Sequence, residues 1–521
     1  MDIAKRVENN TLVMVILFIA LVGIYFSLGY LTYDRAGKIA LASSATIGIL
    51  SALLRKYNNK PFKIFAAIII FILFANLYFH TFIHDVFKVD KKDVLVVKAM
   101  FETDTKESVE FFSQYRYFIW KHLFLFIITY FFYIYLFFKK HITQAASIST
   151  KILIAWIIFF IGAHIIKAMR RGNPFVYFPY YYTKWQNDLK KLKNLNEILE
   201  KNIKSGILGE ISYKEDEKNT IVWVIGEAST KYNWSLYGYL RETTPFMEKR
   251  VKQNEIIKFN NIKAAGSYTT VAFKRMFTQA TLQQKELWKT TPSLLQIAKK
   301  AGYHTYWITN QTTDSYSSIL HIFATQADEF YLTNRGKASS KSDYDESVIP
   351  KYKKALNDNY KRKFIIIHLL ESHAKYEYRY PKEFAKYTRV FDDKVAKDLS
   401  KKGIAKWAIF FRNTYDNSVL YSDYLKNRLL DILQNSKEAN NSIWLYHPDH
   451  GEDVSHHDNF SGHNPKVKEQ WDIPMLLWPK SKFLYVDNNR SFRLDQINNT
   501  ILNLLKIKTK FYDKNKDILA R

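Results

Sequence analysis

Five long apolar segments in the first third of the chain restrict its fold more than any other feature of the sequence. A helix needs about 20 apolar residues to cross a bilayer, and the first segment approaches this length without a charge. It does not resemble a cleavable signal, because it lacks a small-residue cleavage site and further apolar segments follow it. The fourth segment carries Lys121 and His122 near its start. We therefore expect about five transmembrane helices, over Leu12–Tyr30, Ile39–Leu54, Ile64–Ile83, Tyr117–Phe138 and Ile152–Ile166.

Basic residues between these segments predict how the chain crosses the membrane. Lys5 and Arg6 precede the first segment, the second loop (Arg55–Lys63) is rich in lysine and arginine, and the fourth loop begins at Lys139. Loops rich in these residues stay on the cytoplasmic side. With an odd number of spans, everything after Lys167 then lies outside the cytoplasm. No nucleic acid partner is expected there, and the net charge of +28 favours a lysine-rich surface that faces water or anionic lipid.

Composition divides the chain into three parts. We expect a transmembrane helical domain over residues 1–168, interfacial connector helices over 169–214 and an extracytoplasmic domain over 215–521. Residues 169–185 combine tyrosine, tryptophan and basic side chains, as segments at the lipid headgroups do. Asn187–Lys204 alternates leucine and lysine at helical spacing, which predicts an amphipathic helix. The chain has no cysteine, which excludes disulfide bonds, thiolate catalysis and cysteine-based zinc sites.

Short apolar runs alternate with helical patterns in residues 215–521. This alternation predicts an α/β domain with a mostly parallel sheet that helices cover on both faces. Ligands of such sheets bind at the carboxyl ends of the strands. The helices are expected over Thr291–Ala301 and Asn413–Gln434. The strands are expected over Ile221–Ile225, His304–Thr309, Phe364–Leu369, Ser442–Tyr446 and Ile473–Trp478.

Acidic and histidine side chains follow two of these strands. Glu227 comes directly after the run IVWVIG, and the turn Asp449-His450-Gly451-Glu452 follows SIWLYHP. Asp449 and His450 can both reach one ion from such a turn, and Glu227 can add an oxygen from a neighbouring strand end. Oxygen and nitrogen ligands of this kind suit zinc. The alternative for the Asp-His turn taken alone is a solvated loop.

Further histidines lie near the same strand ends. His368 ends the apolar run FIIIH and is either a core residue or a ligand. His373 and His463 fall in loops on the presumed active face, where ligand or proton-transfer roles are expected. Three other histidines are neighbours of the site with no assigned task, namely His447, His456 and His457.

A nucleophile is predicted in the segment AAGSYTTVAFKRM. Gly266 precedes the hydroxyls of Ser267, Thr269 and Thr270, which open an apolar run with helical spacing. A hydroxyl at a helix amino terminus lies near unpaired amides and the positive end of the dipole, and both favour an alkoxide and the anion that it attacks. A zinc ion would lower the pKa of the hydroxyl further. The alternative is that these residues only cap the helix.

With these motifs the chain resembles the phosphoethanolamine transferases, membrane-bound members of the alkaline phosphatase/sulfatase superfamily. Several motifs occur in the order found in that family, and the resemblance spans the whole chain, including the amino-terminal helices. It implies an alkaline-phosphatase/sulfatase-like fold for the soluble domain. The matching segments are IGEAST with Asn233–Pro245, then His368–Pro381, Tyr415–Leu425 and Asp449–Pro465.

The resemblance also implies the roles of individual residues. A zinc ion would be held by Glu227, Thr269, Asp449 and His450. Thr269 would carry phosphoethanolamine covalently, with Thr270 as the alternative, because Val271–Lys274 replaces the family's serine- and proline-containing run. The donor phosphate or a second zinc would be bound by His373 and His463, which would also assist proton transfer.

The expected function is that of an enzyme of the bacterial inner membrane with its catalytic domain in the periplasm. It would transfer phosphoethanolamine from phosphatidylethanolamine to lipid A, the lipopolysaccharide core or another envelope acceptor. A glycerophosphate transferase of the lipoteichoic-acid-synthase type is one alternative, and phosphatidylglycerol as the only donor would favour it. A catalytically inactive membrane lipid sensor is another, and loss of a zinc ligand would mark it. A sulfatase is disfavoured, because Ala264–Met276 lacks a C/S-x-P-x-R sequence.

Overall fold

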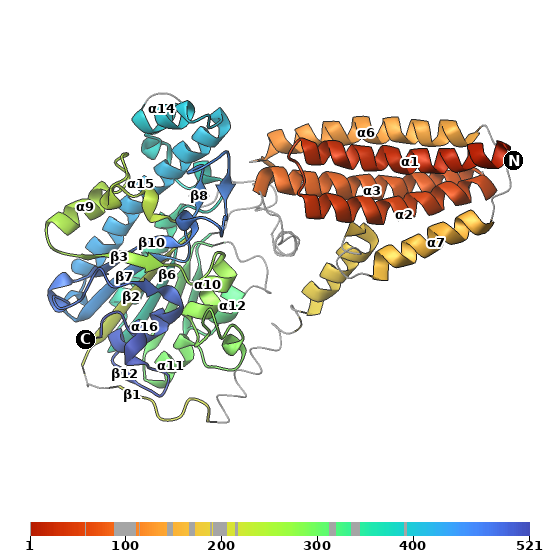
Figure 1. The fold of residues 1–521 in the computed structure, drawn as a ribbon. Coiled ribbons are helices and arrows are strands. Elements are labelled where there is room, and N and C mark those ends of the chain that lie inside the picture. The colour runs from red at the N-terminus through yellow and green to blue at the C-terminus, as the bar shows by residue number, and fades with distance from the viewer. Residues whose placement is uncertain are drawn as a thin grey trace. The chain divides into compact units, whose positions relative to one another are not determined.

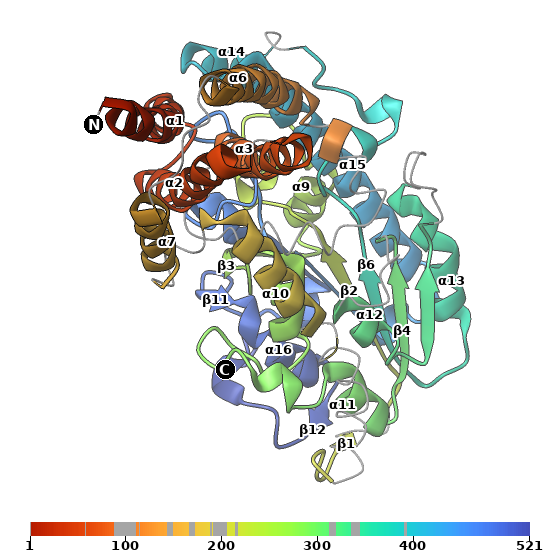
Figure 2. The same ribbon diagram turned by 90° about the vertical axis from the view of Figure 1, so that its right-hand side faces the viewer.

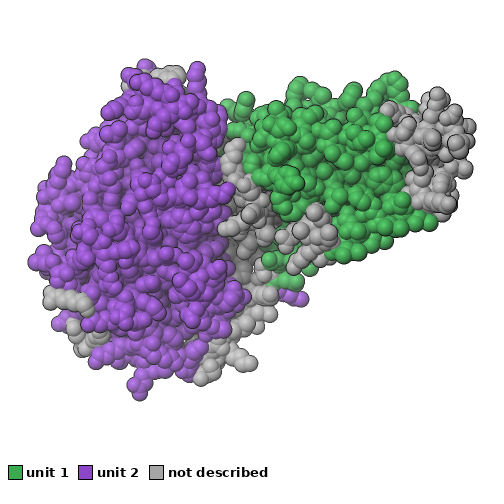
Figure 3. Space-filling view, in the orientation of Figure 1, with its two compact units in different colours: residues 1–103, 112–188 green, residues 104–111, 189–521 purple. Residues whose placement is uncertain are grey.

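The computed structural model is drawn as ribbons in Figures 1 and 2. It divides into two compact units, residues 1–103 with 112–188 and residues 104–111 with 189–521 (Figure 3). The structure describes residues 2–57, 59–87, 111–113, 115–142, 150–165, 172–187, 190, 206–213, 217–311, 319–334, 344–389 and 393–520.

Each of the five apolar segments forms a helix in the first unit. These helices are α1 (Asp2–Ser27), α2 (Tyr33–Lys56), α3 (Lys60–Phe87), α6 (Arg116–Ile142) and α7 (Thr150–Ile165). Within the described residues, three stretches are long and apolar enough to cross a membrane, in α2, α3 and α6. The apolar parts of α1 and α7 are shorter, and Ile166 lies outside the described residues. Five spans therefore remain a prediction.

The polar residues at the start of the fourth segment have a partner on α3. Lys121 Nζ donates a hydrogen bond to Asp85 Oδ2 at 3.1 Å, and His122 Nε2 lies 2.9 Å from the same oxygen. Ionisable groups in apolar helices are tolerated when they pair in this way. Helix α6 therefore includes Lys121 and His122 without interruption. The predicted amphipathic helix over Asn187–Lys204 lies almost entirely outside the described residues, but residues 174–187 before it are helical.

An eight-stranded sheet forms the centre of the second unit, in the order β11-β3-β10-β7-β2-β6-β4-β5. Among the described strands, β10 runs antiparallel to both its neighbours, and every other pair in this sheet is parallel. The sheet is therefore mixed, with the predicted parallel pairs at its centre. Its strands are β2 (Asn219–Gly226), β3 (Ile257–Lys263), β4 (His304–Thr309), β5 (Glu329–Leu332), β6 (Arg362–His368), β7 (Ser442–Pro448), β10 (Asp472–Trp478) and β11 (Phe492–Arg493).

Two short ribbons lie outside this sheet. Strand β1 (Ser212–Tyr213) pairs with β12 (Ile507–Lys508), and β8 (Asp453–Val454) pairs with β9 (Ser461–Gly462). The second ribbon follows the Asp-His turn directly and joins it to the loop of His463. It thus brings two predicted parts of the site together.

Helices cover both faces of the sheet, and strand β2 is therefore buried on both sides. Trp223 packs in one hydrophobic cluster with α10, α11, α12 and α16, whereas Val222 and Val224 pack in a second cluster with α9, α13 and α15. Such two-sided burial is typical of central parallel strands. The helices are α9 (Pro245–Lys252), α10 (Thr269–Met276), α11 (Leu294–Lys300), α12 (Ile319–Ala324), α13 (Ile349–Asn357), α14 (Lys394–Lys401), α15 (Lys406–Gln434) and α16 (Ile497–Leu504).

The register of the central strands places the site. Ile225 on β2 is level with His368 on β6 and with His447 on β7, and Gly226 is level with Pro448. Parallel strands in this register end at the same edge of the sheet. The residues that follow β2 and β7, and the last residue of β6, therefore converge there.

Candidate functional site

Glu227 lies at the centre of the converging strand ends. It follows β2 directly, and its side chain is 2% exposed. Thr269 Oγ1 donates a hydrogen bond to Glu227 Oε1 at 3.0 Å, and Gln311 Nε2 donates to Oε2 at 3.2 Å. His450 Nε2 lies 3.2 Å from Oε1. The carboxylate thus joins a helix start, a strand end and a turn that are far apart in sequence.

Asp449 and His450 reach the same point from the turn after β7. Asp449 Oδ1 accepts hydrogen bonds from the amides of Ala228 at 3.2 Å and His450 at 2.7 Å. Its Oδ2 is buried, accepts no hydrogen bond within the described residues, and lies 3.5 Å from His450 Nε2. His450 Nδ1 donates to the carbonyl oxygen of Gly451 at 2.8 Å, which leaves the lone pair of the neutral ring on Nε2.

These side chains fit a zinc ion. One ligand atom from each of Glu227, Asp449 and His450 lies within 4.8 Å of the others, and all three residues are buried. The Thr269 hydroxyl lies 3.4 Å from His450 Nε2 and can complete a four-ligand set. Two carboxylates, an imidazole and a hydroxyl match the ligands and the coordination number of zinc. The orphaned oxygen of Asp449 faces this group and has no other described partner.

The electrostatics of the group also favour a cation. Burial and the charge of Glu227 raise the pKa of Asp449 to about 6. Burial disfavours a charged imidazole, but the carboxylates of Asp449 and Glu227 outweigh it and raise the pKa of His450 to about 10. Burial also opposes ionisation of Glu227, yet hydrogen bonds from His368 and His450 hold its pKa well below the usual value. The site therefore attracts positive charge.

The segment predicted to hold the nucleophile begins helix α10. Thr269 is the first residue of the helix, and its hydroxyl, rather than that of Thr270, contacts Glu227. Gly266 allows the preceding loop to fold against the helix start, since a Cβ there would lie 2.9 Å from the amide nitrogen of Ala272. The role of nucleophile is a prediction, but of the two threonines Thr269 has the required position.

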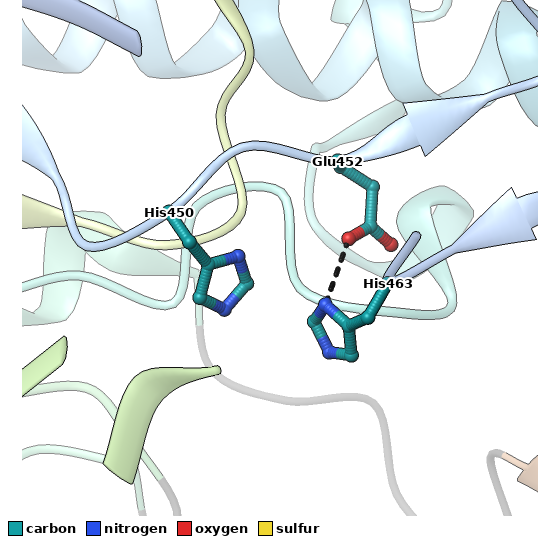
Figure 4. Close-up of side chains that lie close together, drawn as sticks. All are labelled: His450, Glu452 and His463. Carbon is teal, nitrogen blue, oxygen red and sulfur yellow. Dashed lines mark ion pairs between the residues drawn. The ribbon is translucent and has the colours of Figure 1, made fainter. Parts of the chain in front are cut away.

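His463 lies beside the group, and Figure 4 shows its ring below the Glu452 carboxylate and to the right of His450. Its Nδ1 atom is 3.2 Å from Glu452 Oε2, and its ring lies edge-on to that of His450 at 4.7 Å between centroids. The side chain of His463 is 39% exposed, whereas that of Glu452 is buried. Tyr376 donates a hydrogen bond to Glu452 Oε1 at 2.8 Å and fixes the carboxylate. His463 is therefore accessible to solvent on one side and faces a buried carboxylate on the other.

The other histidines occupy different surroundings. His368 Nε2 lies 3.8 Å from Glu227 Oε2, and its ring packs on Phe273, so it borders the group from the core. His373 lies in the turn after β6, and its charge contributes to the lowered pKa of Glu227. His447 is a core residue, and its Nε2 accepts a hydrogen bond from Trp223.

Two residues near Glu227 were missed by sequence reasoning. Gln311 follows β4 and donates hydrogen bonds to Glu227 and to the carbonyl oxygen of Leu369. Glu371 lies three residues after β6 and accepts a hydrogen bond from the Glu227 amide. Polar residues shortly after a predicted strand were the available signal for both, because strand ends form the active edge of such sheets.

Comparisons with known proteins show what the second unit of the chain is similar to. Residues 219–507 match the family described as Sulfatase. "Phosphoethanolamine transferase EptC" of Escherichia coli (strain K12) is 31% identical over 354 residues, which are 65% of this chain. The chain spans 59% of the length of that relative.

Two solved structures extend the comparison. The crystal structure of the C-terminal periplasmic domain of EcEptC from Escherichia coli, in complex with Zn, has a TM-score of 0.55 and 32% identity. The match covers 60% of this chain and 89% of the chain in that crystal structure. The integral membrane protein lipooligosaccharide phosphoethanolamine transferase A (EptA) from Neisseria meningitidis has a TM-score of 0.62 and 20% identity, with 99% of this chain and 97% of that one covered. The second likeness shows a common fold along almost the whole chain.

Proposed function

The chain belongs to the sulfatase family, and we propose that it is a membrane-bound, zinc-dependent phosphoethanolamine transferase. The observation that carries the proposal is the hydrogen bond from Thr269 Oγ1 to Glu227, within the group of buried ligand atoms that Glu227 forms with Asp449 and His450. The names of the relatives and the zinc complex of a similar domain support it.

The proposed site holds one zinc ion through Glu227, Thr269, Asp449 and His450. Bound there, zinc would offset the two carboxylates and lower the pKa of the threonine hydroxyl. Thr269 Oγ1 attacks the phosphorus of phosphatidylethanolamine, so that an oxygen–phosphorus bond to Thr269 replaces the bond to diacylglycerol. Thr269 gives up its hydroxyl proton in this step, and diacylglycerol takes up one proton and leaves as an alcohol, so that the protons balance. Helix α10 begins at Thr269 and directs its amino-terminal amides toward the attacked anion.

The second half of the reaction restores the enzyme. A hydroxyl or phosphate of lipid A, the lipopolysaccharide core or another envelope acceptor attacks the phosphorus, and Thr269 recovers its proton. His463 is placed for proton transfer, because it lies against His450 and is partly exposed, with Glu452 beside its Nδ1 atom. His373 binds the donor phosphate or assists the same transfer.

The proposed location is the bacterial inner membrane. The apolar amino-terminal helices would provide five spans, connector helices would follow over residues 169–214, and the catalytic domain would lie in the periplasm over 215–521. Both substrates are amphiphiles, so a membrane anchor raises their effective concentration at the site. The net charge of +28 suits an acidic glycolipid acceptor.

Intact-mass analysis of the protein purified from cells tests the proposal. Wild type and the control Thr270→Val should carry a phosphoethanolamine adduct, and Thr269→Val should lack it, because valine keeps the shape of threonine without the hydroxyl. An adduct that persists in Thr269→Val would rule out this nucleophile. A glycerophosphate adduct would instead indicate an enzyme of the lipoteichoic-acid-synthase type, and zinc binding without any adduct or transfer would indicate an inactive lipid sensor.

A second experiment tests the metal ligands. Glu227→Ala should abolish zinc retention and activity while membrane insertion is unchanged. Zinc content by elemental analysis, turnover of labelled phosphatidylethanolamine and recovery in the membrane fraction measure the three properties. Full activity in Glu227→Ala would disprove the site.

A further inference from the structure

A buried ion pair lies directly behind the proposed metal site. Lys426 Nζ, on α15, lies 2.9 Å from Glu371 Oε1, and both side chains are fully buried. Ser422 and Tyr446 also donate hydrogen bonds to the Glu371 carboxylate, at 2.6 and 2.8 Å. The Lys426 ammonium lies over the rings of Trp234 and Tyr446. Buried charges persist only when they are paired and hydrogen-bonded, and this pair meets both conditions.

The same carboxylate contacts the backbone of Glu227. The amide of Glu227 donates a hydrogen bond to Glu371 Oε2 at 3.1 Å, and the amide of Ser372 donates to the Glu227 carbonyl oxygen at 3.3 Å. The turn at Glu371 and Ser372 therefore holds both backbone groups of the residue whose side chain faces the metal site. Gly226 makes room for this contact, since a Cβ there would lie 1.7 Å from Glu371 Oε2.

The backbone of Glu371 is strained to reach this position. Its φ is +37°, in a region that residues with side chains rarely adopt. Asp345 stabilises the turn, because its carboxylate accepts hydrogen bonds from the amides of Leu370 and Glu371 at 2.9 and 2.8 Å. Strain of this kind persists only where the surroundings fix it, and it gathers at functional sites. His373 follows in the same turn.

We propose that Glu371 is a positioning residue, which fixes the backbone of Glu227 and so directs its carboxylate at zinc, while Lys426 fixes Glu371. The inference rests on the proposed role of Glu227 as a zinc ligand. Partners that orient metal ligands contribute to affinity even though they do not touch the metal. Glu371 supplies this orientation through the main chain of the ligand rather than through its side chain.

Zinc affinity of the full chain in detergent tests the inference, measured by competition with a chelating indicator. Glu371→Gln should weaken zinc binding by about 10- to 100-fold. A glutamine has one oxygen, whereas Glu371 accepts hydrogen bonds with both, from Glu227 on one side and from Lys426 and Ser422 on the other. Gly226→Ala keeps both charges of the pair but displaces the carboxylate, so it should weaken binding similarly and carries the test if Glu371→Gln does not fold.

A second buried ion pair provides the matched control. Lys363 Nζ and Glu438 Oε1 are 3.1 Å apart, with side chains 0% and 3% exposed, at the opposite end of β6 from His368. Glu438→Gln should lower the unfolding temperature in EDTA, as Glu371→Gln does, but leave the zinc Kd unchanged. If the zinc Kd of both Glu371→Gln and Gly226→Ala stays within twofold of the wild-type value, the inference about Glu371 is overturned and the proposed function still stands. Wild type that binds no zinc overturns the proposed function and the inference together.

Discussion

Replacing Asp449 by asparagine should stabilise the zinc-free protein and destabilise the zinc-loaded protein. Asp449 Oδ1 accepts hydrogen bonds from the amides of Ala228 and His450, and an asparagine oxygen in the same place can accept both. The substitution therefore changes only Oδ2 and the charge. Within the described residues, Oδ2 accepts no hydrogen bond, so its replacement sacrifices none and gives up only the ion-pair contact of 3.5 Å with His450 Nε2.

The gain without zinc follows from the pKa of Asp449. Burial and the charge of Glu227 raise this pKa from 3.8 to about 6. The pKa of Asp449 is higher in the folded protein than in the unfolded chain. The free energy of unfolding therefore falls as the pH rises from 3.8 to about 6, and below 3.8 this loss is absent. One pH unit corresponds to about 1.4 kcal/mol, so the cost at pH 8 is about 3 kcal/mol. Weaker hydrogen bonds to a neutral acceptor offset part of this, which leaves a net gain of about 1–2 kcal/mol.

Zinc reverses the order of stability. An ion present at a thousand times its Kd stabilises the folded state by about 4 kcal/mol, and at ten times its Kd by about 1.4 kcal/mol. Loss of a charged ligand should weaken binding by about 100-fold, as much as the loss of an important outer partner. At the same zinc concentration the variant then loses about 3 kcal/mol of zinc stabilisation relative to wild type, more than it gained.

Thermal unfolding of the full chain at pH 8, in EDTA and in excess zinc, measures both effects. The unfolding temperature of Asp449→Asn should exceed that of wild type by a few degrees in EDTA and fall below it in zinc. Asp423→Asn is the control, because Asp423 is a buried carboxylate whose pKa is raised to about 7 and which caps α9 through the amides of Phe246 and Met247. Its effect should be the same in both conditions. An Asp449→Asn effect of the same sign with and without zinc would refute the reasoning.

Three further predictions follow from the same contacts. A Cβ on Gly451 would lie 2.1 Å from the carbonyl oxygen of Glu469, so Gly451→Ala should displace the His450 turn. Turnover should fall about 100-fold, and the free energy of unfolding should fall by about 1–3 kcal/mol. Unchanged turnover in Gly451→Ala would contradict the site geometry. His463→Gln should retain zinc by elemental analysis and lose about 100-fold or more in turnover; loss of zinc would instead make His463 a ligand. Because burial raises the pKa of Asp423 from 3.8 to about 7, the free energy of unfolding should fall as the pH rises across that interval, and Asp423→Asn should flatten the profile in urea titrations.

Local patterns in the sequence were sufficient to predict the secondary structure around the site. The predicted strand His304–Thr309 coincides with β4, and Ser442–Tyr446 lies within β7. Both are buried apolar runs, and such runs can be read from neighbouring residues alone. Three strands of the eight-stranded sheet were missed, namely β3 and the two edge strands β5 and β11. In β3 the alternation of apolar and polar residues is interrupted at Asn260-Asn261, β5 has four residues and β11 has two. Pairing with neighbouring strands, which is not local, therefore defines them.

The sequence by itself determined the apolar helices, the α/β character of the soluble domain and the residue types that could bind zinc. Only the tertiary structure decided that the Thr269 hydroxyl lies 3.4 Å from His450, which is 181 residues away, and that β10 runs against its neighbours. It also decided that Glu371 and Lys426 lie behind Glu227. Hydrophobic periodicity is a property of neighbouring residues, whereas the order and register of strands depend on the packing of the whole domain. The meeting of strand ends therefore has no signature in any single segment.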